Sequence, residues 1–171
     1  AAVRKVIEAM PLCVTITRGP QHRIEQANRL ARALVGHREV EGELVERALP
    51  HLEASGNAAV LNVISAGAFL FAANQAMYSA AKAGLMAMTR AMAAAYAGKG
   101  IRVNALAPGT VDTDMVRNNA PEVVESMKNS SFMRRAAHPD EMVGPALLLC
   151  SDAGSFITGQ VIIADGGLTP H

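Results

Sequence analysis

The feature that most constrains the fold is a nearly continuous apolar run at residues 58–64, broken only by Asn62. Apolar side chains at successive positions indicate a strand that is buried on both faces, as strands inside a parallel sheet are. Two more strands are predicted at residues 101–106 and 161–164, and helical segments separate the three. Alternating strands and helices imply right-handed crossovers, so we expect an α/β fold in which helices pack on a parallel sheet.

The helix predicted at residues 75–97 is unusually apolar, since Ala, Met and Leu dominate it. Such a helix is either buried within the chain or shared with a partner, and both interpretations stay open. Lys82 and Arg90 lie near its centre, so it is not expected to span a membrane. Residues 110–135 are expected to form a polar, mixed connector, and a further helix is predicted at residues 139–152.

The first part of the chain follows a different pattern. Residues 12–17 alternate apolar and polar side chains, which predicts a half-buried strand, and residues 23–25 predict a return strand after a Gly-Pro turn. Two short helices are predicted at residues 28–35 and 43–52. The second is expected to be interrupted or to end near Pro50.

Composition excludes several classes of partner. The formal net charge of +1 argues against a nucleic acid or an anionic membrane recognised by bulk charge. Charged residues at positions 4, 5 and 8 interrupt any early apolar region, so no signal peptide is expected. Cys13 and Cys150 lie far apart without metal-ligand spacing, which predicts no metal site and two buried or free thiols in a reducing cytoplasm.

Tyr78 and Lys82 form the pair of residues that most clearly suggests a catalytic function. Four positions apart on a helix, they lie on one side, one turn from each other. The Lys82 ammonium favours the ionised phenol of Tyr78, which suits that phenol to general acid/base catalysis on a hydroxyl or carbonyl group. Ser65 ends the preceding strand, where the sites of parallel sheets open, and its hydroxyl is suited to hold the substrate oxygen. A Tyr-x-x-x-Lys spacing alone also arises incidentally on helices.

Further motifs surround this pair in a specific order and spacing. They are Asn62-Val63-Ile64-Ser65, Tyr78-Ser79-Ala80-Ala81-Lys82, Ile101-Arg102-Val103-Asn104-Ala105-Leu106-Ala107-Pro108-Gly109, Ser151-Asp152, Ile157-Thr158-Gly159-Gln160 and Asp165-Gly166-Gly167. Together they resemble the short-chain dehydrogenase/reductase family, from about Ala48 to Gly167. The resemblance implies a Rossmann-like fold and an oxidoreductase that moves hydride between NAD or NADP and a small carbonyl or alcohol substrate.

The resemblance also implies roles for individual residues. Ser65 would polarise the substrate oxygen, Tyr78 would transfer the proton, and Lys82 would favour the ionised tyrosine and bind the nicotinamide ribose. The helix at residues 75–97 would pack against its counterpart in a homo-oligomer, which suits the apolar side chains of Leu85, Met86, Met88 and Met92. The nicotinamide side of the cofactor pocket would be lined by Pro108, Gly109, Val111 and Thr113.

The cofactor half of the family pattern has no counterpart in residues 1–60. No G-x-G-x-x-G or comparable glycine cluster, which would let backbone approach a pyrophosphate, occurs there. The fold is therefore expected to be a partial Rossmann-like sheet that lacks the N-terminal nucleotide-binding strands. The strand at residues 58–64 would then have an open edge that invites self-association.

The segment that stands in place of the cofactor half loosely resembles the start of a PAS domain. An apolar strand, a turn, a second strand and Ala27-Asn28 lead there into a short helix. We therefore expect a small α+β segment at residues 1–47, truncated and PAS-like, and a catalytic half at residues 48–171. The predicted function is an oxidoreductase impaired by its missing cofactor half. The alternative is a catalytically silent fragment or chimera with a sensor-like or protein-interaction role.

Overall fold

A computed structural model of the chain describes residues 14–18, 23–27, 45–70 and 75–169. Within these residues the strands form one five-stranded sheet of order β2-β1-β3-β4-β5. Neighbouring strands are parallel except β2, which is antiparallel to β1. The expected α/β fold with a parallel sheet is confirmed. The strands are β1 (Val14–Arg18), β2 (Arg23–Ala27), β3 (Ala58–Val63), β4 (Ile101–Pro108) and β5 (Val161–Ala164).

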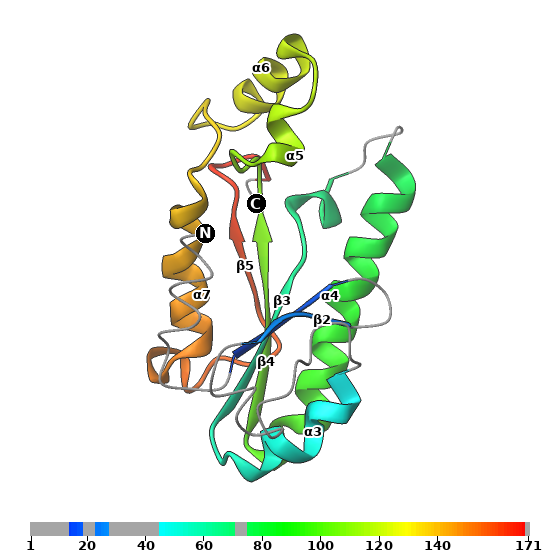
Figure 1. Cartoon of the computed structure of the whole chain (residues 1–171), viewed down its shortest axis with the longest axis vertical. Coiled ribbons are helices and arrows are strands. Elements are labelled where there is room, and N and C mark those ends of the chain that lie inside the picture. Colours follow the sequence, from blue (N-terminus) through cyan, green and yellow to red (C-terminus); the bar gives the residue numbers. More distant parts are fainter. Residues whose placement is uncertain (1–13, 19–22, 28–44, 71–74, 170–171) are drawn as a thin grey trace.

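Helices cover both faces of this sheet. Figure 1 shows α4 and α7 on opposite sides of it, with α5 and α6 beyond the ends of β4 and β5. The predicted long helix is confirmed as α4, and the helix predicted at residues 139–152 is confirmed as α7 with short 3-10 turns on either side of it. The helices are α3 (Val45–Ala54), α4 (Ala76–Tyr96), α5 (Asp114–Arg117), α6 (Pro121–Asn129) and α7 (Val143–Cys150).

Successive side chains of β3 enter two different cores, as its apolar run predicts. Leu61 packs with Leu149 and Cys150 of α7 on one face of the sheet. Val60 packs with Met92 of α4 on the other face. Since side chains alternate along a strand, a strand between two helix layers needs an apolar residue at almost every position.

The first two predicted strands are present as an antiparallel pair, and their position corrects one expectation. The edge of β3 was expected to be open, but β1 pairs with it in parallel, with Val14 opposite Ala59 and Thr17 opposite Asn62. Self-association through a bare β3 edge therefore loses its structural reason. The helix predicted at residues 28–35 and the thiol of Cys13 lie outside the described residues.

One other local expectation was wrong, and a second segment gains detail. Pro50 lies inside α3 rather than at its end. The helix continues because Leu52 is buried against the core beside β3 and α4, and that packing outweighs the backbone hydrogen bond that a proline forgoes. Residues 110–135, predicted as a polar and mixed connector, contain the two short helices α5 and α6. Pro121 at the first position of α6 is the kind of start signal that marks such short helices.

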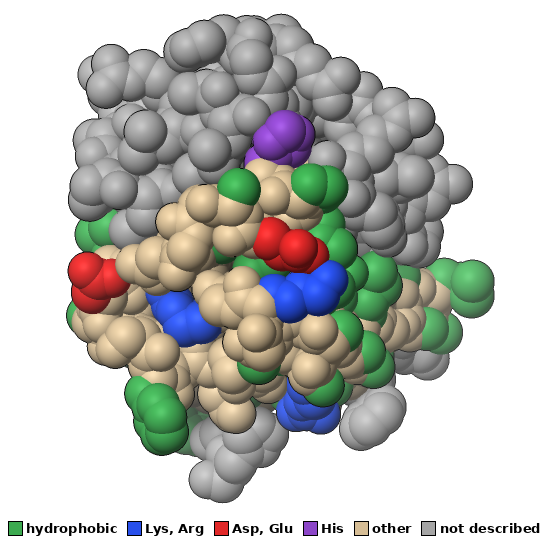
Figure 2. All heavy atoms as spheres, turned by 90° about the horizontal axis from the view of Figure 1, so that it is seen from below, with side chains coloured by type: hydrophobic (Ala, Val, Ile, Leu, Met, Phe, Trp, Pro, Cys, Tyr) green, Lys and Arg blue, Asp and Glu red, His purple; other side chains and the backbone are tan. Residues whose placement is uncertain are grey.

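The end of the molecule where β3 and β4 begin carries charges of both signs. Figure 2 views this end from below and shows acidic and basic side chains in contact among the described residues. At this end, Lys99 Nζ lies 2.6 Å from Glu53 Oε1 in an ion pair.

In the described part of the chain, no helix is long and apolar enough to cross a membrane. No group of three or more His, Cys, Asp or Glu side chains is placed there to hold a metal ion.

Candidate active site at the end of strand β3

Ser65 lies just beyond β3, at the carboxyl edge of the sheet. Its backbone is extended, and it caps the short 3-10 turn η1 (Ala66–Ala68). The Ser65 Oγ accepts a hydrogen bond from the Gly67 N–H at 3.0 Å. The Ile64 N–H donates to the Leu106 carbonyl at 2.8 Å, so Ser65 lies beside the last residues of β4. The hydroxyl is thus held in one place by the turn that carries it.

Tyr78 and Lys82 lie on the first turns of α4 and project beside Ser65. The Lys82 Nζ is 5.8 Å from the centre of the Tyr78 ring and donates to the Val63 carbonyl, at the end of β3, over 3.2 Å. A side chain added at Gly67 would have its Cβ 3.1 Å from Tyr78 Cε1 and 3.3 Å from Ser65 Oγ. The structure therefore brings all three predicted catalytic residues together. Tyr78 remains 46% exposed and accessible from solvent.

A buried polar contact fixes the register of α4 on β3. The Asn62 side chain donates to Thr89 Oγ1 at 2.9 Å, and Thr89 Oγ1 donates to the Leu85 carbonyl at 2.8 Å. Asn62 and Thr89 are fully buried. Buried polar groups are normally paired, so sliding α4 along β3 would break the hydrogen bond between Asn62 and Thr89 inside the core. This contact sets where Tyr78 and Lys82 stand relative to the strand end.

The apolar residues that were expected to face an oligomer partner differ in how far they are buried within the chain. Leu85 and Met92 are buried, and Met86 and Met88 pack against the cores between α4 and the sheet. Leu85 and Met92 therefore agree with burial within one chain, whereas Met86 and Met88 are only partly buried and leave the oligomer interpretation open. The sequence left both interpretations open because periodicity does not distinguish a neighbouring sheet from a second chain.

The predicted cofactor-lining residues follow one another from the end of β4 to the start of α5. Pro108 pairs with Ala164, and the Gly109 N–H donates to the Ala164 carbonyl at 3.1 Å. A Cβ on Gly109 would lie 2.7 Å from the Asp165 Cα, so this position has room for glycine alone. Val111 forms a bridge with Ala137, and Thr113 precedes α5 at the surface.

A cavity of about 300 Å³ opens next to this segment, on the side of β5 and α7. Its lining includes Thr110, Ile163 and Asp165 but none of Ser65, Tyr78 and Lys82. The cavity therefore lies beside the segment that follows β4 and is not lined by the predicted catalytic residues. Arg135 and Glu141 also line it.

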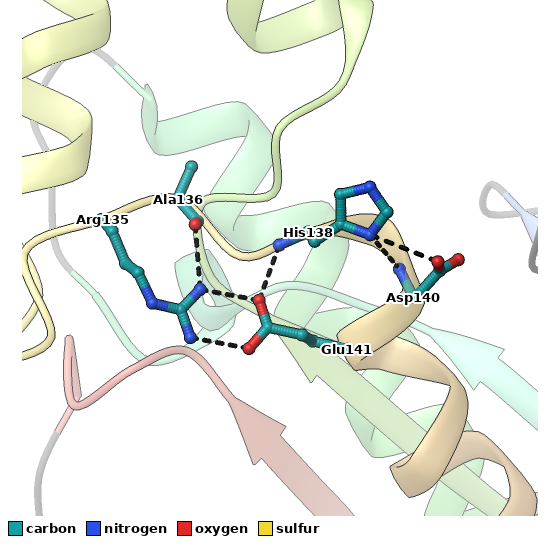
Figure 3. A network of polar contacts seen from close by, with 5 residues as sticks. All are labelled: Arg135, Ala136, His138, Asp140 and Glu141. Atoms are coloured by element: carbon teal, nitrogen blue, oxygen red, sulfur yellow. Dashed lines mark hydrogen bonds and ion pairs between the residues drawn. The ribbon is translucent and has the colours of Figure 1, made fainter.

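Arg135 and Glu141 form a network that sequence reasoning missed (Figure 3). The two guanidinium nitrogens of Arg135 donate to the two carboxylate oxygens of Glu141 at 2.7 Å each. The His138 N–H also donates to Glu141, at 2.7 Å. The bond from Arg135, then that from His138, lowers the pKa of Glu141 from 4.5 to about 2. The sequence signal was Pro139 followed by acids in the first helical turn, which is typical of a helix start.

Comparison with known proteins identifies the class of the chain. Residues 42–169 match the family model described as enoyl-(acyl carrier protein) reductase. A cis-4-hydroxycyclohexanecarboxylate dehydrogenase of Sinomonas cyclohexanicum is 42% identical over 124 residues, which are 72% of this chain and 50% of that protein. A 3-oxoacyl-(acyl-carrier-protein) reductase of Chlamydia pneumoniae is 37% identical over 119 residues, 70% of this chain and 48% of the relative.

Solved structures agree. A gluconate 5-dehydrogenase from Burkholderia cenocepacia J2315, in complex with NADP and tartrate, superposes with a TM-score of 0.69 at 32% identity, over 74% of this chain and 51% of that one. The chain belongs to the short-chain dehydrogenase/reductase family. It spans about half the length of the curated relatives it matches.

Proposed function

We propose that this chain supplies the proton-transfer part of an NAD(P)-dependent oxidoreductase acting on a small alcohol or carbonyl compound. The observation that supports the proposal is the grouping of Ser65, Tyr78 and Lys82 at the carboxyl end of β3. Ser65 follows a strand, whereas Tyr78 and Lys82 lie on a helix, and the three side chains meet beside the turn η1. The relatives' names, which include dehydrogenases of small alcohols and acids, support the substrate class.

Each side chain has a distinct task in this proposal. The Ser65 hydroxyl donates to the substrate oxygen, and Tyr78 gives or takes the proton at that oxygen. The Lys82 ammonium stabilises the tyrosinate and binds the ribose hydroxyls of the cofactor. When bound, a nicotinamide cofactor supplies or accepts the hydride.

The residues present fit only one part of that cofactor. An ammonium and a phenol beside a strand end suit ribose hydroxyls, and Gly109 keeps the neighbouring strand end free of a side chain. Residues 1–60 contain no glycine-rich turn for the pyrophosphate. We therefore propose that activity of this chain by itself is impaired. A catalytically silent fragment with a sensor-like or protein-interaction role is the competing proposal.

Titration calorimetry with NADH and with NADPH separates the two proposals. The oxidoreductase proposal expects millimolar or tighter binding of one cofactor, lost in Lys82→Ala and retained in Lys99→Ala. Lys99 is a matched control because it follows the other end of α4, where it pairs with Glu53. No heat from either cofactor at saturating concentration would favour the silent fragment.

Three expectations remain predictions: a homo-oligomer through residues 75–97, a location in the cytoplasm, and the PAS-like character of residues 1–47 with its division from residues 48–171. The buried, free Cys150 is compatible with a reducing compartment.

A further inference from the structure

Gly67 stands between the two side chains that would touch the substrate oxygen. Its N–H donates to Ser65 Oγ, and its α-carbon faces the edge of the Tyr78 ring. A Cβ at this position would lie 3.1 Å from Tyr78 Cε1, 3.5 Å from Tyr78 Cδ1 and 3.3 Å from Ser65 Oγ. A methyl group at position 67 would therefore crowd both the Tyr78 ring and the Ser65 hydroxyl.

The backbone conformation does not explain a glycine here. The described glycines with positive φ are Gly56, Gly100, Gly159, Gly166 and Gly167. Gly67 is not one of them, so its φ and ψ are open to residues that have a side chain. The reason for glycine at position 67 is space beside Tyr78 and Ser65.

The hydrogen bond from Gly67 also determines what the Ser65 hydroxyl offers. A serine hydroxyl has one proton and two acceptor sites. Because the Gly67 N–H occupies an acceptor site, the Ser65 proton stays available to donate to another oxygen. A carbonyl or alkoxide oxygen of a substrate lying between Ser65 and Tyr78 is the acceptor that this orientation fits.

We infer that Gly67 is a positioning residue, which holds the Ser65 hydroxyl as a donor and lets the Tyr78 ring stand next to it. This inference rests on the proposed function for its catalytic meaning, but its geometry can be measured without any cofactor. Gly67→Ala keeps the N–H and adds the methyl group, so it separates the effect of space from that of the hydrogen bond. The Tyr78 ring or Ser65 must then shift by a few tenths of an ångström.

The chain offers a clean spectroscopic reporter, since it has two tyrosines and no tryptophan. In a Tyr96→Phe background labelled with 3-fluorotyrosine, the ¹⁹F resonance reports on Tyr78 alone. We expect Gly67→Ala to move this resonance and Gly84→Ala to leave it in place. Gly84 is the matched control because it lies on α4 and a Cβ there has no heavy atom within 4 Å.

A second measurement needs no substitution at position 67. In the Gly67 chain, proton NMR should show a nuclear Overhauser effect between the Gly67 α-protons and the Tyr78 ring. Unchanged ¹⁹F resonances in a folded Gly67→Ala chain, or no such Overhauser effect, would overturn the inference. If Gly67→Ala does not fold, the Overhauser effect decides alone.

Steady-state turnover measurements test the role of Gly67 separately from the proposed function. Where the unsubstituted chain reduces a ketone, Gly67→Ala should lower kcat about tenfold, since small misplacements of reacting groups are costly. KM for the nicotinamide cofactor should stay unchanged, and Gly84→Ala should retain full kcat. If the chain shows no turnover, cofactor titration calorimetry decides the proposed function and the two NMR measurements decide the role of Gly67. Full kcat in a folded Gly67→Ala chain would contradict that role.

Discussion

The two helices that cover opposite faces of the sheet, α4 and α7, are held in different ways. α4 has 21 residues, and it has neither a side-chain cap at its first turn nor a basic residue in its last. α7 has 8 residues and also lacks a side-chain cap at its first turn, but polar side chains brace the segments on either side of it. Arg135 and Glu141 brace the turn η4 (Pro139–Met142) before it, and Arg102 donates to carbonyls at its end.

The difference shows how helix length changes what must stabilise a helix. A long helix has enough side chains to be anchored by packing, and α4 buries Leu85, Thr89, Met92 and Ala93 along its length. A helix of eight residues leaves about half of its backbone N–H and C=O groups without intrahelical partners, so its ends need donors and acceptors from elsewhere. The first turns of α4 are therefore left for Tyr78 and Lys82, whereas the polar residues around α7 serve structure.

The largest expected effect tests the proposed catalytic role of Tyr78 at the start of α4. If the chain turns over, Tyr78→Phe should lower kcat by about 10²–10⁴-fold, because the phenol proton is lost. Its free energy of unfolding should hardly change, because the ring remains and Tyr78 is 46% exposed. Steady-state oxidation of NADH or NADPH with a small ketone measures the first and urea unfolding the second. Tyr96→Phe is the control, and unchanged turnover in Tyr78→Phe would refute the assignment.

The next effect tests the structural side. The Arg102 guanidinium donates to the Leu149 carbonyl at 2.6 Å and to the Ser151 carbonyl at 3.1 Å, which are end groups of α7. Arg102→Ala should lower the free energy of unfolding by about 1.5–3 kcal/mol, the usual range for hydrogen bonds to a charged group. Urea unfolding checks it.

Arg90→Ala is the matched control for that measurement. Arg90 lies exposed on α4, so its removal should change stability by less than about 0.5 kcal/mol. Equal losses in the two variants would remove the contrast between a packed α4 and an α7 braced by polar side chains.

The smallest expected effect is a change in how the stability of the folded chain depends on pH in the acid range. The pKa of Glu141 is about 2 in the folded chain and 4.5 ordinarily, so its ionised form stabilises the folded state above pH 4.5. That contribution falls as the pH drops from 4.5 through 2. Glu141→Gln should therefore lower the urea midpoint at pH 7 slightly and flatten its decline between pH 5 and 2. The effect is small and sensitive to salt because the side chain is 42% exposed.

An exposed glutamate of α6 provides the comparison for this pH series. Glu122→Gln should leave the acid decline of the urea midpoint as steep as in the unsubstituted chain. A decline that is equally steep in Glu141→Gln would show that the Arg135–Glu141 pair contributes nothing to the stability of the α7 side.

Much of the fold could be predicted because its signals are local. The apolar run at β3 predicted a strand buried on both faces, and both cores around Val60 and Leu61 confirm it. The continuation of α3 past Pro50 could not be predicted, since burial of Leu52 outweighs a local penalty. The pairing of β1 with β3 could not be predicted either, because strand neighbours far apart in sequence leave no periodic signal.

The residues of the candidate site likewise fall into those predicted from the sequence and those that only the packed structure revealed. Ser65, Tyr78 and Lys82 were predicted from residue type, from spacing and from a family resemblance, and the structure brings their side chains together. Gly67 and the Arg135–Glu141 pair were missed. A single glycine carries no side-chain signal, and its importance lies in what a methyl group would touch. Two ion-pairing residues six positions apart are common on any surface.

The sequence by itself determined an α/β fold, its parallel strands and the three residues suited to proton transfer. These follow from side-chain periodicity and chemistry, which are properties of short segments. Only the tertiary structure decided that β1 covers the edge of β3, that Leu85 and Met92 of α4 are buried against the sheet, and that Gly67 lies beside both Tyr78 and Ser65. Each of these depends on distances between segments, which are set when the chain packs and not before.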